Sequence, residues 1–160
     1  MTLLGETVAR PPTPFVRDAG QALERAQRAF ERGRTEEAIN LLEQALTMGA
    51  DTAATRTMLG LAYARNRRVD RALEHLEYAA GLEPEAFGPQ CALGELHMRL
   101  CAVELARQYL ARALECASTA AERTYVQRLL HEERIRDRQR IQRPSFRKPF
   151  WPRRRRRGED

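Results

Sequence analysis

The clearest pattern of apolar positions is a repeat with a period of 34 residues. At this spacing, small residues align with small residues and leucines align with leucines over three copies. The aligned columns are Ala38, Ala72 and Ala106; Leu42, Leu76 and Leu110; Ala45, Ala79 and Ala113; and Leu46, Ala80 and Leu114. A repeat of this length predicts stacked helix pairs, each of which is too small to bury its apolar face without a neighbour.

Small residues also recur in the first half of each copy. Gly60 aligns with Gly94 and with Ala26. A residue without a bulky side chain is expected to let a neighbouring helix approach closely at each of these positions.

The second copy reads Leu59-Gly60-x-x-Tyr63, then Ala72-x-x-x-Leu76-x-x-Ala79, then Pro84. This series resembles the tetratricopeptide repeat, a 34-residue helix–turn–helix unit. The resemblance implies an all-α, right-handed superhelix with units at residues 19–52, 53–86 and 87–118. The third copy departs from the family pattern at His97, which stands in the tyrosine column.

Local signals predict where the helices begin. Asp18 and Gln21 are spaced as a capping pair for the first helix, and Thr35 is placed to cap the second. Residues 1–17 are expected to form an extended N-terminal arm that precedes the repeats.

A seventh helix is predicted over residues 119–142. Thr119 and Glu122 have the spacing of a capping box, and Pro144 is expected to stop the helix. One apolar face followed by the polar stretch 132–142 is typical of a helix that caps a repeat array. Glu132 and Glu133 are expected on its solvated face.

The family resemblance implies a concave groove lined by the first helix of each pair. The residues at these positions are Leu23, Gln27, Phe30, Thr57, Leu61, Ala64, Arg65, Cys91, Glu95, Met98 and Arg99. A half-apolar lining of this kind suits an extended or amphipathic peptide, so the leading hypothesis is a non-catalytic protein-interaction scaffold. Some family members capture a C-terminal carboxylate with a clamp of Lys, Asn and Arg. The clamp positions here hold Leu23, Gln27, Met58, Gly88 and Ala92, so this mode of capture is not expected.

Charge is distributed unevenly over the 160 residues, whose formal net charge is +6. Residues 134–160 hold 12 of the 28 basic and 3 of the 22 acidic residues, which leaves residues 1–133 with a net charge of −3. We expect a disordered tail over 143–160. Its basic and aromatic residues are Arg143, Phe146, Arg147, Lys148, Phe150, Trp151, Arg153, Arg154, Arg155, Arg156 and Arg157. Such a tail can serve as a solubilising extension, contact nucleic acid or an anionic membrane surface, or fold back on the acidic body.

The remaining chemistry excludes several classes. No phosphate-binding glycine loop and no nucleophilic-serine motif is present, and Ile135 stands where a second zinc-binding histidine would follow His131. His97, Cys101 and Cys91 are candidate metal ligands, but the position of His97 in the tyrosine column favours a packing role. No catalytic residue, metal or cofactor is therefore expected.

Three cysteines without paired spacing and a start without a signal pattern favour a cytoplasmic protein. A small secretion-type chaperone is an alternative on size and repeat number alone. The sequence identifies neither the partner nor the oligomeric state.

Overall fold

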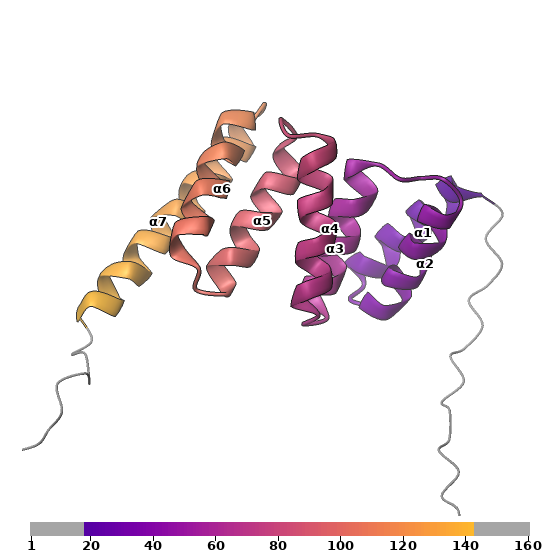
Figure 1. Cartoon of the computed structure of the whole chain (residues 1–160), viewed down its shortest axis with the longest axis horizontal. Coiled ribbons are helices and arrows are strands. Elements are labelled where there is room, and N and C mark those ends of the chain that lie inside the picture. Colours follow the sequence, from indigo (N-terminus) through magenta and orange to yellow (C-terminus); the bar gives the residue numbers. More distant parts are fainter. Residues whose placement is uncertain (1–17, 143–160) are drawn as a thin grey trace, which may run out of the picture.

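The computed structural model describes residues 18–142, and within this range all regular structure is helical. Seven helices follow one another along the chain (Figure 1). They are α1 (Ala19–Glu31), α2 (Thr35–Thr47), α3 (Ala53–Arg65), α4 (Val69–Leu82), α5 (Phe87–Arg99), α6 (Val103–Cys116) and α7 (Ala120–Gln142). The arm 1–17 and the tail 143–160 lie outside the described residues.

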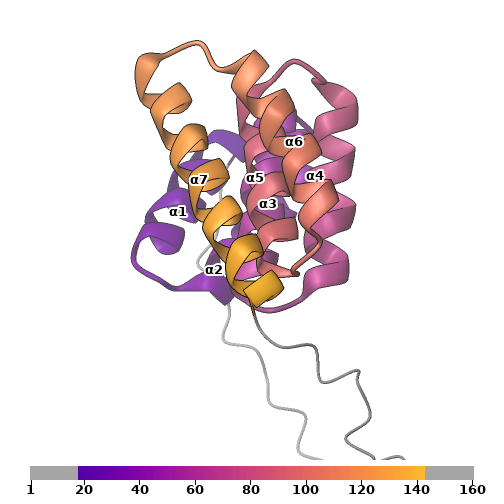
Figure 2. The same ribbon diagram turned by 90° about the vertical axis from the view of Figure 1, so that its left-hand side faces the viewer.

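The helices stack as antiparallel pairs in chain order. Within a pair, α1 packs on α2, α3 on α4 and α5 on α6, and α3 also contacts both α2 and α5. This arrangement places α1 at one end of the stack and α7 at the other (Figure 1). Viewed from the α7 end, α4 and α6 lie together on one side of the stack (Figure 2). The predicted all-α helical repeat is confirmed.

The repeat columns form the core. All residues of the three most regular columns are fully buried: Ala38, Ala72, Ala106, Leu42, Leu76, Leu110, Ala45, Ala79 and Ala113. One continuous cluster extends from α1 to α5, and a second one joins α5 and α6 to α7 through Val126. Burial therefore follows the period of the sequence.

Two glycines allow the helices of a pair to touch. A Cβ atom on Gly60 would lie 2.6 Å from Cγ of Leu76, and one on Gly94 would lie 2.6 Å from Cδ2 of Leu110. Real Cβ atoms do not approach this closely. The expected close approach at Gly60 and Gly94 is confirmed, and the structure shows that the neighbour is the second helix of the same pair.

The departure at His97 is explained by an exchange between two columns. In the second pair, Tyr63 of α3 stacks on His75 of α4, with ring centroids 5.5 Å apart. In the third pair the same two positions are reversed, and His97 of α5 stacks on Tyr109 of α6 at 5.3 Å. Each interface therefore keeps one tyrosine and one histidine ring in a stacked arrangement.

The helix starts follow the predicted caps with one exception. The Gln21 amide donates to Asp18 at 2.7 Å, and the amides of Glu122 and Thr119 donate to each other's side chains at 3.1 and 2.9 Å. Thr35 does not cap α2, because it is already the first helical residue and its hydroxyl lies near the Gly33 carbonyl. Gly33 has a φ of +75°, and this turn delivers the chain directly into α2.

The last helix packs on α6 and α5. The expectation that Glu133 is solvated is wrong, because its side chain is 5% exposed and accepts a hydrogen bond from Nε of Arg107 at 3.0 Å. Glu132 is exposed. None of the described helices combines the length and the apolar character that crossing a membrane requires.

Candidate functional site

A pocket of about 600 Å³ opens where the three helix pairs meet. Its walls come from the end of α1, from α3, from the turn that joins α4 to α5, and from the start of α5. The lining residues are Gln27, Phe30, Glu31, Ala53, Ala54, Thr57, Met58, Leu61, Glu83, Ala86, Gly88 and Pro89. The site is therefore shared by all three repeats and exists only once they are stacked.

The α1 wall is fixed by an arginine from α3. The guanidinium of Arg65 lies 3.9 Å from the centroid of the Phe30 ring, and its Nη1 donates to the Phe30 carbonyl at 2.8 Å. Both contacts use the same cation, so Arg65 holds the last turn of α1 and orients the aromatic ring. Phe30 and Leu61 remain half-buried and present apolar surface to the pocket.

The inner wall is built where α3 meets the start of α5. The Thr57 hydroxyl donates to the Ala53 carbonyl at 2.7 Å, so its hydrogen-bonding capacity is used inside the helix. A Cβ atom on Gly88 would lie 3.9 Å from the Thr57 methyl carbon. Because Gly88 has no side chain, the space in front of Thr57 and Met58 stays open.

The charged residues of the pocket lining are both carboxylates. Glu31 and Glu83 are exposed at the rim, and Gln27 donates to Glu31 at 3.0 Å. Two arginines lie beside this lining: Arg65 is held on Phe30, and Arg112 lines a neighbouring concavity together with Glu83 and Ala86. The site therefore combines an apolar interior with two carboxylates at its rim.

The structure divides the predicted groove residues into two groups. Gln27, Phe30, Thr57 and Leu61 come together in the pocket. The others lie elsewhere: Leu23 packs on the first core cluster, Ala64 is buried in it, Arg65 covers Phe30, Cys91 is buried, Glu95 binds Tyr125, Met98 packs on the second cluster, and Arg99 is exposed at the end of α5.

Sequence reasoning missed the wall that comes from the α4–α5 segment. Glu83, Ala86 and Pro89 lie outside the regular columns of the repeat, so the 34-residue period gives no signal for them, whereas Gly88 was named only as a clamp position. The only available hint was Pro84, which marks this segment as a turn.

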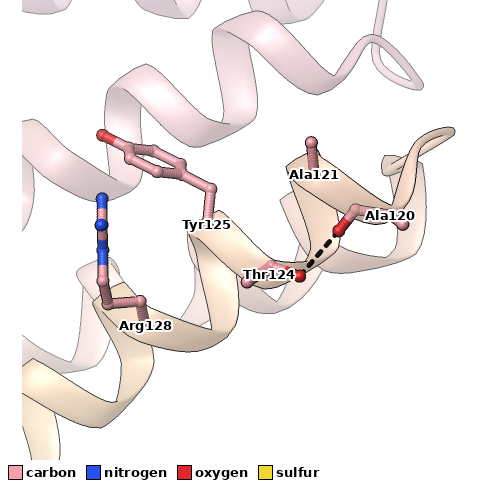
Figure 3. A pocket seen from close by; sticks show the side chains of 5 residues that line it. All are labelled: Ala120, Ala121, Thr124, Tyr125 and Arg128. Atoms are coloured by element: carbon pink, nitrogen blue, oxygen red, sulfur yellow. Dashed lines mark hydrogen bonds between the residues drawn. The ribbon is translucent and has the colours of Figure 1, made fainter.

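A second, shallower concavity lies on α7 (Figure 3). Tyr125 and Arg128 point the same way from this helix, and the guanidinium lies 5.2 Å from the ring centroid. The Tyr125 hydroxyl donates at 2.7 Å to Oε1 of Glu95, which also accepts from the Cys91 thiol at 3.7 Å. Burial, followed by the proximity of Glu95, raises the pKa of both Tyr125 and Cys91 to about 12.

These contacts show that the cluster joins α7 to α5. Neutral Tyr125 and Cys91 both donate to the same oxygen of Glu95, so this oxygen is used within the fold. Cys91 is a buried thiol whose raised pKa disfavours the reactive thiolate. The candidate metal ligands have different surroundings, since His97 stacks on Tyr109 and Cys101 is exposed. In residues 18–142, no group of three or more His, Cys, Asp or Glu side chains is arranged to hold a metal ion.

Comparison with known sequences decides the family. The sequence model of the tetratricopeptide repeat matches residues 23–87 and, in a second overlapping match, residues 57–121. The chain belongs to the tetratricopeptide repeat family. Its two matches are offset by 34 residues, the period of the buried columns. No curated protein matches the chain significantly.

Solved tetratricopeptide structures share this fold. The first such domain of the human RPAP3 protein aligns with a TM-score of 0.65 and 20% identity, covering 76% of this chain and 95% of that one. The first such domain of Spaghetti (RPAP3), bound to the HSP90 peptide SRMEEVD, aligns with a TM-score of 0.65 and 20% identity, covering 78% and 94%. Yeast Tom70 aligns with a TM-score of 0.67 and 14% identity, covering 79% of this chain and 30% of that one.

Proposed function

We propose that this tetratricopeptide protein is a non-catalytic interaction scaffold that holds a peptide segment of a protein partner in the pocket between its three repeats. The observation that carries the proposal is the apolar pocket of about 600 Å³ to which α1, α3 and the start of α5 all contribute. Pockets of this volume, apolar inside and polar at the rim, are typical of ligand-binding sites. The peptide-bound structure among those that share the fold supports the same kind of use.

The pocket is already formed by the packed helices. Thr57 is buried, Phe30 is oriented by Arg65, and Gly88 leaves the interior open. Binding to a preformed site requires little ordering of the protein, so more of the interaction energy appears as affinity. One fully buried aliphatic or phenylalanine side chain of a partner would contribute about 1.5–3 kcal/mol.

The partner would be held along its length and not by a terminal carboxylate. The positions that form a carboxylate clamp in some family members hold Leu23, Met58, Gly88, Ala92 and Gln27 here, and none of these residues is cationic. The rim of the pocket instead carries the carboxylates of Glu31 and Glu83. We therefore expect the pocket to select an apolar anchor that has basic neighbours.

The test is selection of peptides from a random display library on the full chain, followed by calorimetry on the enriched sequences. Leu61→Glu places a charge on the pocket wall and should weaken binding at least tenfold. Leu105→Glu is the matched control, because Leu105 is exposed on α6 and does not line the pocket. Equal binding by both variants, with unchanged circular dichroism, would count against the pocket.

The alternative function through the basic tail remains a prediction, because residues 143–160 lie outside the described part of the chain. Nothing in residues 18–142 bears on contact with nucleic acid or a membrane surface.

A further inference from the structure

The turn between α2 and α3 is tied to α4 by one arginine. Asp51, which lies in this turn, accepts a hydrogen bond from Nε of Arg56 at 2.7 Å and a second one from its Nη2 at 2.9 Å. The remaining nitrogen of the guanidinium, Nη1, lies 3.1 Å from Nδ1 of His75 on α4. The guanidinium also lies 4.5 Å from the centroid of the Tyr78 ring. Arg56 on α3 therefore connects the turn to α4.

The contact between Arg56 and His75 requires a neutral imidazole. A guanidinium can only donate hydrogen bonds, so Nδ1 must present its lone pair and the ring proton must lie on Nε2. A protonated imidazole donates from both nitrogens, so it would turn an N–H and a positive charge toward Arg56. The ring is also confined, because His75 is 9% exposed and stacks on Tyr63. Protonation therefore changes this contact from attractive to repulsive.

The surrounding charges favour the neutral ring. Those that act on His75 come from three helices: Arg56 of α3, Arg71 and Glu74 of α4, and Glu43 of α2. Among the described residues, α5, which also packs on α4, contributes none of them. Burial, followed by the guanidinium of Arg56, holds the pKa of His75 below its ordinary value. The hydrogen bonds from Arg56 hold the pKa of Asp51 low as well, so this carboxylate stays charged while His75 titrates.

The next repeat ties its turn without any ionisable group. Gln90 stands one period after Arg56, and its Nε2 donates at 3.0 Å to the Pro84 carbonyl in the turn between α4 and α5. Tyr109 stands one period after His75. An amide and a carbonyl do not change charge between pH 5 and about 8, where histidine does. The two turns are therefore held at equivalent positions, and the first of them alone is held through a histidine.

The turn that Arg56 holds leads directly into a wall of the pocket. The Thr52 hydroxyl caps α3 by accepting from the Thr55 amide at 3.1 Å. Ala53 and Ala54, which follow the cap, line the pocket between the three repeats. A wall that is free to move must be ordered again when a ligand binds, which lowers the affinity.

We propose that Arg56 and His75 form an acid-sensitive latch, in which protonation of His75 releases the turn 48–52 from α4 and weakens binding in the pocket. The effect on binding rests on the proposed function, whereas the release of the turn does not. The latch is closed at neutral pH and opens below pH about 6.5, the ordinary range of histidine.

Nuclear magnetic resonance of the full chain follows the latch from pH 7.5 to pH 5. The imidazole nitrogen shifts should place the His75 proton on Nε2 at pH 7.5 and show a protonated ring at the acid end. With the same midpoint, the Nε–H signal of Arg56 should shift. The protection of the Thr55 and Arg56 amides from hydrogen exchange, corrected for intrinsic rates, should fall by roughly fivefold or more. The amides at the start of α5 should keep their protection.

Two variants remove the switch in different ways. His75→Asn keeps a neutral acceptor that cannot be protonated, and Arg56→Gln introduces the residue that the next repeat uses. In both variants the protection at the start of α3 should no longer depend on pH. His97→Phe is the matched control, because His97 is a buried imidazole that stacks on Tyr109, and this variant should switch like the wild type.

Three results would overturn the latch: a His75 ring that stays neutral down to pH 5, a turn that does not respond when the ring titrates, or a response that persists in both variants. Calorimetry with enriched peptides that lack histidine tests the effect on the pocket. The affinity at pH 5 should be roughly fivefold or more below that at pH 7.5 in the wild type, and equal at both values in His75→Asn.

The two claims can fail separately. If the turn responds to pH while the affinity does not, the latch does not control the pocket and that part of the proposal is wrong. If no peptide binds at pH 7.5, the proposed function fails, and the resonance measurements still decide whether His75 releases the turn.

Discussion

Replacement of Gly60 by alanine tests whether close helix contact is the basis of the repeat. The new methyl group would lie 2.6 Å from Cγ and 2.8 Å from Cδ2 of Leu76, and 3.1 Å from the carbonyl oxygen of Ala72. Leu76 is fully buried and cannot move toward solvent. Overpacking of this kind costs about 1–3 kcal/mol, and two atoms below 3 Å place it at the upper end.

A second effect acts in the opposite direction. Alanine favours a helix interior over glycine by about 1 kcal/mol, so the expected net loss for Gly60→Ala is about 1–2 kcal/mol. Gly81→Ala is the matched control, because Gly81 is exposed inside α4 and a Cβ atom there meets nothing within 4 Å. It should stabilise the protein by about 0.5–1 kcal/mol.

The assay is urea unfolding followed by far-ultraviolet circular dichroism. The two variants should move the midpoint in opposite directions, with Gly60→Ala lower by about 0.5–1 M if the slope is near 2 kcal/mol/M. In a Leu76→Ala background the clash is absent, so Gly60→Ala should no longer destabilise. The reasoning is refuted if Gly60→Ala stabilises the protein like Gly81→Ala, or if its cost is the same in both backgrounds.

Three further predictions concern buried polar groups. Burial lowers the pKa of His75 and of His97, so the unfolded chain takes up protons at a higher pH than the folded chain does. The stability that comes from these two histidines should therefore be fully present above pH about 6.5 and be lost below it. His97→Phe should reduce the difference between the urea midpoints measured at pH 7.5 and at pH 5. Arg107→Ala removes the cation that pairs with the buried carboxylate of Glu133 and should lower the free energy of unfolding in urea by about 1–3 kcal/mol. The loss should be smaller than for a fully buried pair, because Arg107 is 38% exposed. Adding Glu133→Met should recover most of the lost stability. Tyr125→Phe removes the hydroxyl that joins α7 to α5 and should cost about 1 kcal/mol, seen as faster hydrogen exchange of α7 amides with α1–α4 unchanged.

The helix pairs could be predicted because their signals are local and repeated. Each copy carries small residues and leucines at the same spacing, and a helix converts this spacing into one buried face. The caps at Asp18 and Thr119 were predictable for the same reason, since donor and acceptor are three residues apart. The misassigned cap at Thr35 shows the limit, because the turn at Gly33 places Thr35 one position too far into the helix.

The exchange of tyrosine and histidine between columns was also present in the sequence. Tyr63 and His97 differ by one period, and so do His75 and Tyr109. Only the stacked rings explain why the third copy can replace its tyrosine, because the two columns face each other across the same helix pair.

The sequence alone determined that this chain folds as stacked helix pairs with a fixed set of buried columns, because short-range spacing decides which face of each helix avoids water. Only the tertiary structure decided which residues line a common pocket. The offset between stacked pairs brings Phe30, Leu61 and Gly88 together from three repeats, and it buries Glu133 against Arg107. Contacts between residues about 30 positions apart depend on that offset, and no local pattern in the chain records it.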